Sequence, residues 1–248
     1  MIYCARSHTG NHRKRNEDSY HIPEDIAAKS LFVIADGMGG FSYGNAASRA
    51  TVDAVVKTMQ GESRALPVRM IFDAANAANI LVRRIAQKVG RNTAMGSTLT
   101  LALVEGRQIY VGNVGDSRAY LLDAEKLCCI TRDHTYVDEL VRAGMITPGE
   151  ARTHPQRHAI TRAIGIRERV DIDVFEVQWE AGDVLLLCSD GLSNHVEDAQ
   201  IERMLRNRGD LETVADALIE TALDNGGEDN ITVVLAQNTG PEKREVRA

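Results

Sequence analysis

The hydrophobic and polar positions of this chain follow two periods, and these periods predict its strands and helices. Short apolar runs, either continuous or alternating with polar residues, indicate strands. They cover Tyr3–Ser7, Leu31–Ala35, Ser97–Val104, Gln108–Val114, Arg118–Leu122, Val170–Val177, Asp183–Cys188 and Ile231–Ala236. Apolar residues at i, i+3, i+4 and i+7 indicate helices. The predicted helices, long and short, cover about Gly44–Met59, Pro67–Val89, Tyr136–Ala143, Pro148–Arg152, Ala199–Leu205 and Leu211–Leu223.

Three of these segments indicate how the elements pack. The run Val184–Cys188 is apolar on both faces, so this strand must be covered on both sides. The helix Pro67–Val89 has an alanine-rich stripe, which suits close packing on a sheet. The strands between Ser97 and Leu122 are joined by short glycine-containing turns, which predicts an antiparallel meander.

One stretch, from Asp133 to Gly165, breaks both periods apart from its two short predicted helices. Irregular insertions of this length are usually functional or mobile, so we expect a surface flap over about residues 133–165. The residues after Gly240 are polar, and we expect a disordered tail over 241–248. Because no repeat or linker divides the chain, we expect one domain over residues 1–240.

Composition and charge exclude several classes of protein. The chain has 248 residues, 44% of them hydrophobic, which is ample for a sizeable core. A formal net charge of −6 gives no indication of nucleic-acid or anionic-membrane binding. The amino terminus has no apolar core like that of a signal peptide, and no apolar run is long enough to span a bilayer. The cysteines form no Cys-x-x-Cys pair, so we expect free thiols in a reduced, cytoplasmic protein; they are Cys4, Cys128, Cys129 and Cys188.

Four acids lie where predicted strands begin or end. Asp36, Asp116 and Asp190 each follow an apolar run, and Asp229 directly precedes one. Each could be a turn acid, because Asp-Gly is a common turn dipeptide. If the strand ends meet at one edge instead, the crowded carboxylates would repel one another unless cations hold them. Carboxylates favour hard cations such as Mg²⁺ or Mn²⁺, and two such ions can activate a water and clamp a phosphoryl group.

A basic cluster near the amino terminus runs directly into two more acids, Glu17 and Asp18. Taken alone, this stretch reads as a solvated loop whose charges partly cancel. As part of a site, Arg13 would hold a phosphate, since its planar guanidinium matches phosphate oxygens, and the acids would hold a metal.

Six short motifs occur in order along the chain. They are Arg13-x-x-Asn16-Glu17-Asp18, Asp36-Gly37-Met38-Gly39-Gly40, Gly96-Ser97-Thr98, Gly115-Asp116-Ser117-Arg118, Ser189-Asp190-Gly191-Leu192 and Glu228-Asp229-Asn230. Each is weak alone, but the ordered set resembles the metal-dependent, type 2C serine/threonine protein phosphatases from about Arg6 to Ala236. The resemblance implies an α+β fold, a four-layer α-β-β-α sandwich of two antiparallel sheets flanked by helices, with the metal site at one edge.

The resemblance also implies a role for each matched residue. It makes Asp36, Asp190 and Asp229 ligands of a first Mn²⁺ or Mg²⁺ ion, and Asp36, Glu17 and the carbonyl of Gly37 ligands of a second. Asp116, with Asp190, resembles the acids that hold a third ion in bacterial members. Asp18 and Asn230 resemble supporting residues, and Arg13 resembles a phosphate-binding residue. A water bridging the two metals would attack phosphorus directly.

One position departs from the pattern of many eukaryotic members. They have a histidine directly after the Asp-Gly pair, where it is proposed to protonate the leaving oxygen, and this chain has Met38. The proton donor is therefore open between a metal-bound water and a histidine, with His134, His154 and His158 of the flap among the candidates. A surface role is the ordinary alternative for each of these histidines.

The resemblance implies a bacterial stand-alone catalytic domain that acts on phosphoserine and phosphothreonine proteins. Similar bacterial proteins oppose Hanks-type kinases in cell-wall, developmental or secretion control, and we expect a monomer. One alternative is a pseudophosphatase that only binds phosphoproteins, although the intact acid set argues against it. Another keeps the enzyme but gives it one dedicated regulator as substrate, such as an anti-sigma antagonist. No Cys-x₅-Arg loop of the kind that favours phosphotyrosine is present.

Overall fold

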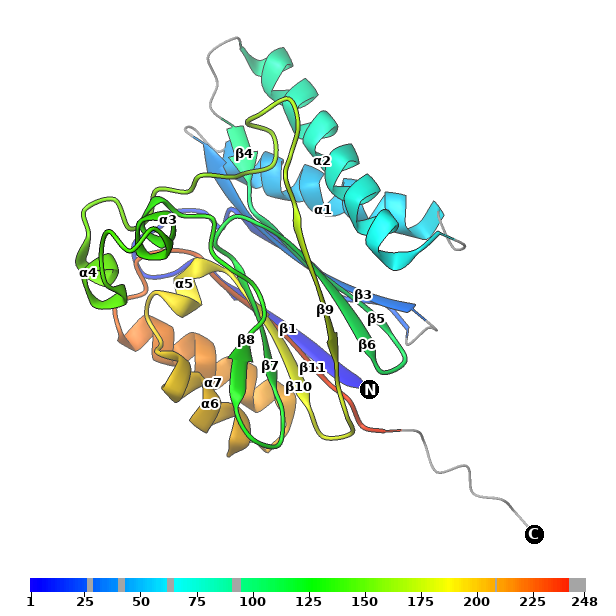
Figure 1. The fold of residues 1–248 in the computed structure, drawn as a ribbon, viewed down its shortest axis with the longest axis vertical. Coiled ribbons are helices and arrows are strands. Elements are labelled where there is room, and N and C mark those ends of the chain that lie inside the picture. Colours follow the sequence, from blue (N-terminus) through cyan, green and yellow to red (C-terminus); the bar gives the residue numbers. More distant parts are fainter. Residues whose placement is uncertain (26–28, 40–42, 62–64, 91–94, 208, 241–248) are drawn as a thin grey trace.

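The computed structural model describes residues 1–25, 29–39, 43–61, 65–90, 95–207 and 209–240, and it has two antiparallel sheets stacked face to face (Figure 1). One sheet has the order β1 (Ile2–His8), β11 (Ile231–Gln237), β10 (Val184–Cys188), β7 (Arg118–Leu122) and β8 (Leu127–Cys129). The other has the order β2 (Asp18–His21), β3 (Lys29–Gly39), β5 (Leu99–Glu105), β6 (Gln108–Val114) and β9 (Asp173–Gln178). A short strand, β4 (Met95–Ser97), also pairs with β3.

Helices cover both outer faces of the stacked sheets (Figure 1). Helices α1 (Tyr43–Gly61) and α2 (Pro67–Val89) pack on the second sheet, and α6 (Asp198–Arg206) and α7 (Leu211–Asp224) pack on the first. The segment 133–165, which we expect to be a flap and call the flap below, holds α3 (Tyr136–Arg142) and α4 (Pro148–Thr153), and a one-turn helix, α5 (Asp190–Ser193), follows β10.

The side-chain alternation of the strands produces three apolar cores. Along β3, Phe32 and Ile34 point into the core between the sheets, while Leu31 and Val33 pack toward α1 and α2. Along β10, Leu185 and Leu187 likewise enter the central core and their neighbours pack toward the helices. Three cores between four layers are the predicted α-β-β-α sandwich, so the α+β fold is confirmed.

The predicted meander between Ser97 and Leu122 is wrong at its last strand. Strands β5 and β6 pair as expected, but β7 pairs with β10 in the other sheet. The turn at Gly115 carries the chain across, and Gly115 has a φ of +109°, a conformation that side chains other than glycine's rarely adopt. The crossing places Asp116 at the point where the two sheets come together.

The strand predicted for Leu31–Ala35 does not end before Asp36. It continues to Gly39, because β4 supplies pairing partners for its last residues, with Gly37 opposite Ser97. Asp36 is therefore inside β3, directly opposite Asp18 of β2. The predicted Ser97–Val104 strand is divided at Thr98, and β2, β8 and α5 were not predicted.

Three further expectations concern the rest of the chain. The tail predicted for residues 241–248 lies outside the described residues. The four cysteines are free thiols, as expected. In the part of the chain that the structure describes, no helix combines the length and apolarity that crossing a bilayer requires.

Candidate active site

A cavity of about 510 Å³ brings together most of the residues singled out in the sequence. They come from the loop before β2, from β3, from the turn before β7, from α5 and from the loop before β11. Its lining includes Arg13, Glu17, Asp36, Gly37, Met38, Asp116, His158, Asp190, His195, Asp229 and Asn230. The four acids predicted at strand ends are therefore one cluster rather than unrelated turn residues.

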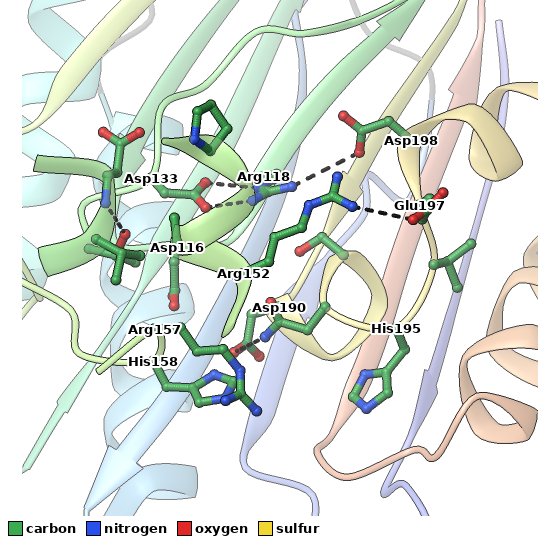
Figure 2. Close-up of a pocket in the computed structure, with 18 of the residues that line it drawn as sticks. Asp116, Arg118, Asp133, Arg152, Arg157, His158, Asp190, His195, Glu197 and Asp198 are labelled. Atoms are coloured by element: carbon green, nitrogen blue, oxygen red, sulfur yellow. Dashed lines mark hydrogen bonds and ion pairs between the residues drawn. The ribbon is translucent and has the colours of Figure 1, made fainter. Parts of the chain in front are cut away.

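A second cavity, of about 650 Å³, adjoins the first and shares Asp116, His158 and Asp190 with it. It lies between the flap helices and the α5–α6 segment, and Figure 2 shows Arg157 and His158 of the flap beside Asp190. Arg152 of α4 reaches across to Glu197 at 3.2 Å, and Arg118 binds both Asp133 oxygens. The acidic cavity thus adjoins a larger groove that is lined on one side by residues of the 133–165 segment.

The clustered acids raise one another's proton affinity. Burial is the largest cause that raises the pKa of these aspartates, and neighbouring carboxylates add to it. The pKa is well above the ordinary aspartate value for Asp36 and Asp116, and above it for Asp190. Burial raises the pKa of Asp18 to about 7, against hydrogen bonds that lower it. Burial and mutual repulsion thus disfavour full ionisation of the cluster unless a cation is bound.

Asp18 lies beneath this cluster and is fixed on one side only. Its Oδ2 accepts hydrogen bonds from Ser189 Oγ at 2.8 Å and from Thr232 Oγ1 at 2.6 Å. Its Oδ1 is buried without a partner, and so is Oδ1 of Asp190, whose other oxygen accepts from Asn194 Nδ2 at 3.0 Å. Buried carboxylate oxygens without donors are costly, so both indicate a site built to receive a cationic or water ligand.

The residues present fit divalent cations with water in their coordination shell. Among the described residues, no three His, Cys, Asp or Glu side chains are grouped tightly enough to enclose an ion by themselves. The cavity nevertheless offers hard oxygen donors from several acids, and one of them, Asp190, has an unpartnered oxygen. Mg²⁺ and Mn²⁺ prefer such donors, and Mg²⁺ in particular retains several waters and takes one or two carboxylates.

Glycine is required where the chain passes Glu17. A Cβ on Gly44 would lie 2.6 Å from Glu17 Oε2 and 2.6 Å from the carbonyl oxygen of Gly37. A Cβ on Gly37 would overlap the carbonyl oxygen of Gly44. Gly44, at the start of α1, therefore leaves room for both the Glu17 carboxylate and the Gly37 carbonyl beside it.

Asn230 and Thr98 tie the site's separate segments together. Asn230 donates from Nδ2 to the carbonyls of Thr9 at 2.8 Å and Arg15 at 2.9 Å, and accepts from the Glu17 amide at 2.7 Å. The buried Thr98 hydroxyl accepts from the Asp36 amide at 2.8 Å and shares a 2.8 Å hydrogen bond with Ser117 Oγ. Each residue thus fixes one acid-bearing segment against another.

The flap histidines differ in position. His134 is buried, and its Nδ1 accepts from the Gly115 amide at 3.1 Å, so it fastens the flap to the Asp116 turn. His154 lies against the ring of Tyr136 and lines neither cavity. His158 lines both cavities. His195, which also lines both, was missed by the sequence interpretation because no motif marks it.

Comparisons with known proteins agree with this geometry. A family model described as Protein phosphatase 2C matches residues 5–236. The serine/threonine phosphatase stp of Listeria monocytogenes is 36% identical over 96% of each chain. The serine/threonine protein phosphatase PstP of Mycobacterium tuberculosis is 40% identical over 95% of this chain and 45% of its own length. A solved PstP structure matches with a TM-score of 0.89 at 38% identity, covering 96% of this chain and 99% of that one. Another, a PstP catalytic domain with two manganese ions, matches at 0.84 with 36% identity over 95% and 97% of the two chains.

Proposed function

Because the chain belongs to the protein phosphatase 2C family and is a serine/threonine protein phosphatase, we propose that the 510 Å³ acidic cavity is its catalytic centre. The observation that carries this proposal is the convergence of Asp36, Asp116, Asp190 and Asp229 from distant segments. The described catalytic segments form one domain, in which residues 133–165 act as the flap.

Within this centre, Asp36, Asp190 and Asp229 would hold one Mn²⁺ or Mg²⁺ ion, and Asp36, Glu17 and the Gly37 carbonyl a second. The shared cavity, the mutual repulsion of the acids and the unpartnered Asp190 oxygen support this assignment. Asp116 lies beside Asp190, where it would share a third ion. Asp18 and Asn230 support the ligands from behind, through the hydrogen bonds described above.

The chain's own residues would bind and orient the phosphate. When bound, a pair of divalent cations supplies an activated water and charge neutralisation for phosphoryl transfer. Arg13 would donate to the non-reacting phosphate oxygens, as a guanidinium is well shaped to do. Of the flap histidines, only His158 lines the cavity that holds the acids, and in its protonated, imidazolium form it would donate a proton to the departing serine or threonine oxygen and become neutral.

Phosphorylated bacterial signalling proteins are the proposed substrates, and a Hanks-type serine/threonine kinase the proposed opponent. The relatives named serine/threonine phosphatases support this reading, as does a catalytic domain that matches nearly all of the Listeria protein. Four free cysteines support a reduced, cytoplasmic setting, and we propose that the enzyme acts as a monomer.

The proposal is tested with a phosphothreonine peptide and an aryl phosphate, each with added Mn²⁺ and with excess chelator. We expect hydrolysis that requires the metal. Binding of the phosphopeptide without any hydrolysis, at confirmed metal loading, would instead identify a pseudophosphatase. Comparison of the phosphoproteome with and without the protein separates a broad substrate set from one dedicated regulator.

A further inference from the structure

His195 bridges two segments that each carry an acid of the cavity. Its Nδ1 lies 2.9 Å from the carbonyl oxygen of Gly191, the residue after Asp190. Its Nε2 lies 3.4 Å from the backbone nitrogen of Glu228, the residue before Asp229. Because a carbonyl can only accept, Nδ1 carries the ring proton and Nε2 accepts from the Glu228 amide. One neutral imidazole thus connects the Asp190 helix to the Asp229 loop.

Other contacts hold the same loop against His195. Asn225 donates from Nδ2 to the His195 carbonyl oxygen at 2.8 Å. On the opposite side, Asn11 donates from its backbone to the Gly227 carbonyl at 2.7 Å and from Nδ2 to the Gly226 carbonyl at 3.0 Å. The loop is therefore clamped between the amino-terminal segment and the α5 turn. Among these contacts, the one between the His195 ring and the Glu228 amide connects the α5 segment directly to the residue before Asp229.

We propose that His195 is a positioning residue that sets the separation of Asp190 and Asp229, and thereby the affinity of the cavity for its divalent cation. The inference rests on the proposed function, which makes these two acids ligands of one ion. The two carboxylates repel each other, and Asp229 is also paired with Arg13. The His195 bridge between the neighbouring backbone groups opposes their separation before an ion binds.

Isosteric variants separate the two halves of the bridge. In His195→Asn, the side-chain amide can still donate to the Gly191 carbonyl, but nothing reaches Glu228. In His195→Gln, the longer side chain can still accept from the Glu228 amide. His195→Ala removes both contacts. Each variant is titrated calorimetrically with MnCl₂ in the absence of substrate, and hydrogen exchange of the Glu228 amide is measured in parallel.

We expect His195→Ala to bind Mn²⁺ roughly tenfold more weakly, the lower end of the effect usually seen when a residue supporting metal ligands is removed. The Glu228 amide should exchange faster in His195→Ala and His195→Asn and stay protected in His195→Gln. At saturating Mn²⁺, kcat should return close to the wild-type value, so the defect lies in metal affinity. His21→Gln is the matched control, because His21 is a half-buried histidine on β2 that lines neither cavity.

The outcomes distinguish this inference from the proposed function. If the wild type binds no Mn²⁺, or Asp229→Asn binds it as well as the wild type does, the proposed function fails. If the wild type binds Mn²⁺ and the folded His195 variants bind it equally well, only the role of His195 is overturned. Thermal melting identifies folding defects, and should His195→Ala not fold, the Asn and Gln variants, each retaining one contact, give the same decision.

Discussion

Arg13 donates from Nη2 to Asp229 Oδ2 at 2.6 Å, so the predicted phosphate-binding residue is paired with a predicted metal ligand. The Arg13 side chain is 53% exposed and Asp229 32%, and ion pairs so accessible to solvent contribute little to stability. The pair therefore holds the guanidinium over the cavity without locking it there. A phosphate entering the site offers the arginine two oxygens in exchange for one carboxylate.

We expect Arg13→Ala to raise KM for a phosphopeptide, with a smaller loss of kcat. A hydrogen bond to a charged group contributes about 1.5–3 kcal/mol, or roughly 10- to 150-fold in kcat/KM. Steady-state kinetics at saturating Mn²⁺ measure this, with Arg84→Ala on the exposed side of α2 as the control. Weakened Mn²⁺ binding with an unchanged KM would assign Arg13 to the metals instead.

Asp36→Ala and Asp229→Ala should each lower kcat by at least ~10³, as loss of a principal electrostatic group does. Excess chelator should abolish wild-type activity on an aryl phosphate. The exposed Asp171, which lies before β9 and lines neither cavity, provides the control Asp171→Ala. Wild-type activity that persists in chelator, with metal content measured as nil, would rule out the metal assignment.

The sequence predicted the acid cluster because each acid borders an apolar run that is visible without a structure. It did not predict that β3 continues past Asp36, because the pairing that extends it comes from Gly96 and Ser97, some 60 residues away. The change of sheet at Gly115 was hidden for a similar reason. Short strands joined by a tight turn look alike whether they pair with each other or belong to stacked sheets.

Residues that hold the site together were harder to predict than residues that line it. His195 acts through two backbone groups, Gly191 O and Glu228 N, and such contacts leave no pattern in side-chain spacing. His134 likewise uses its ring to accept from the Gly115 amide. Asn230 was predicted as a supporting residue only through the family resemblance, and its three side-chain hydrogen bonds connect its segment to Thr9, Arg15 and Glu17.

We expect the stabilising contribution of neutral His134 to be lost at mildly acidic pH. Burial and the nearby Arg162 lower the pKa of His134 below the ordinary 6.5, although Asp173 and Asp133 oppose this. The unfolded chain therefore takes up a proton first as the pH falls. The stability due to neutral His134 is full above about pH 6.5 and is lost progressively below it, with a slope of at most about 1.4 kcal/mol per pH unit.

Urea unfolding of the wild type and of His134→Gln between pH 7.5 and 5.5 measures this contribution. The difference between the two proteins removes the slopes that the acid cluster adds to both. We expect the wild type to lose its advantage over the variant as the pH falls. Parallel pH dependences would show that His134 does not titrate differently in the folded and unfolded states.

His158→Gln should slow hydrolysis of a phosphothreonine peptide by about 10²-fold or more while leaving an aryl phosphate nearly unaffected. The alkoxide of threonine needs a proton as it leaves, whereas a nitrophenolate does not. His154→Gln is the matched flap control, because His154 lines neither cavity. Equal losses on both substrates would remove His158 as the proton donor and leave that role to a bound water.

The lining of the acidic cavity and the neighbouring flap should determine which phosphorylated substrates the enzyme prefers. The cavity that would bind the phosphate is lined by Arg13 and several acids, and the chain has no Cys-x₅-Arg loop of the kind that favours phosphotyrosine. Phosphoserine and phosphothreonine peptides should therefore be cleaved much faster than matched phosphotyrosine peptides. Protein selectivity must come from neighbouring surfaces, and the adjoining 650 Å³ groove is walled by flap residues, Pro148, Ala151 and Arg152 of α4 among them.

Removing Gly144 to Pro155 deletes α4 and its exposed ion pair with Glu197, but leaves His134 and its contacts to the Asp116 turn in place. We therefore expect the trimmed protein to fold and to hydrolyse an aryl phosphate at close to the wild-type rate. Its kcat/KM on phosphoproteins should change several-fold, because the deleted helix forms the groove wall and not the metal site. A clear preference for phosphotyrosine would contradict the substrate class. Equal rate losses on aryl phosphate and phosphoprotein would contradict the flap's role, since a groove that reads protein surfaces cannot affect a substrate too small to touch it.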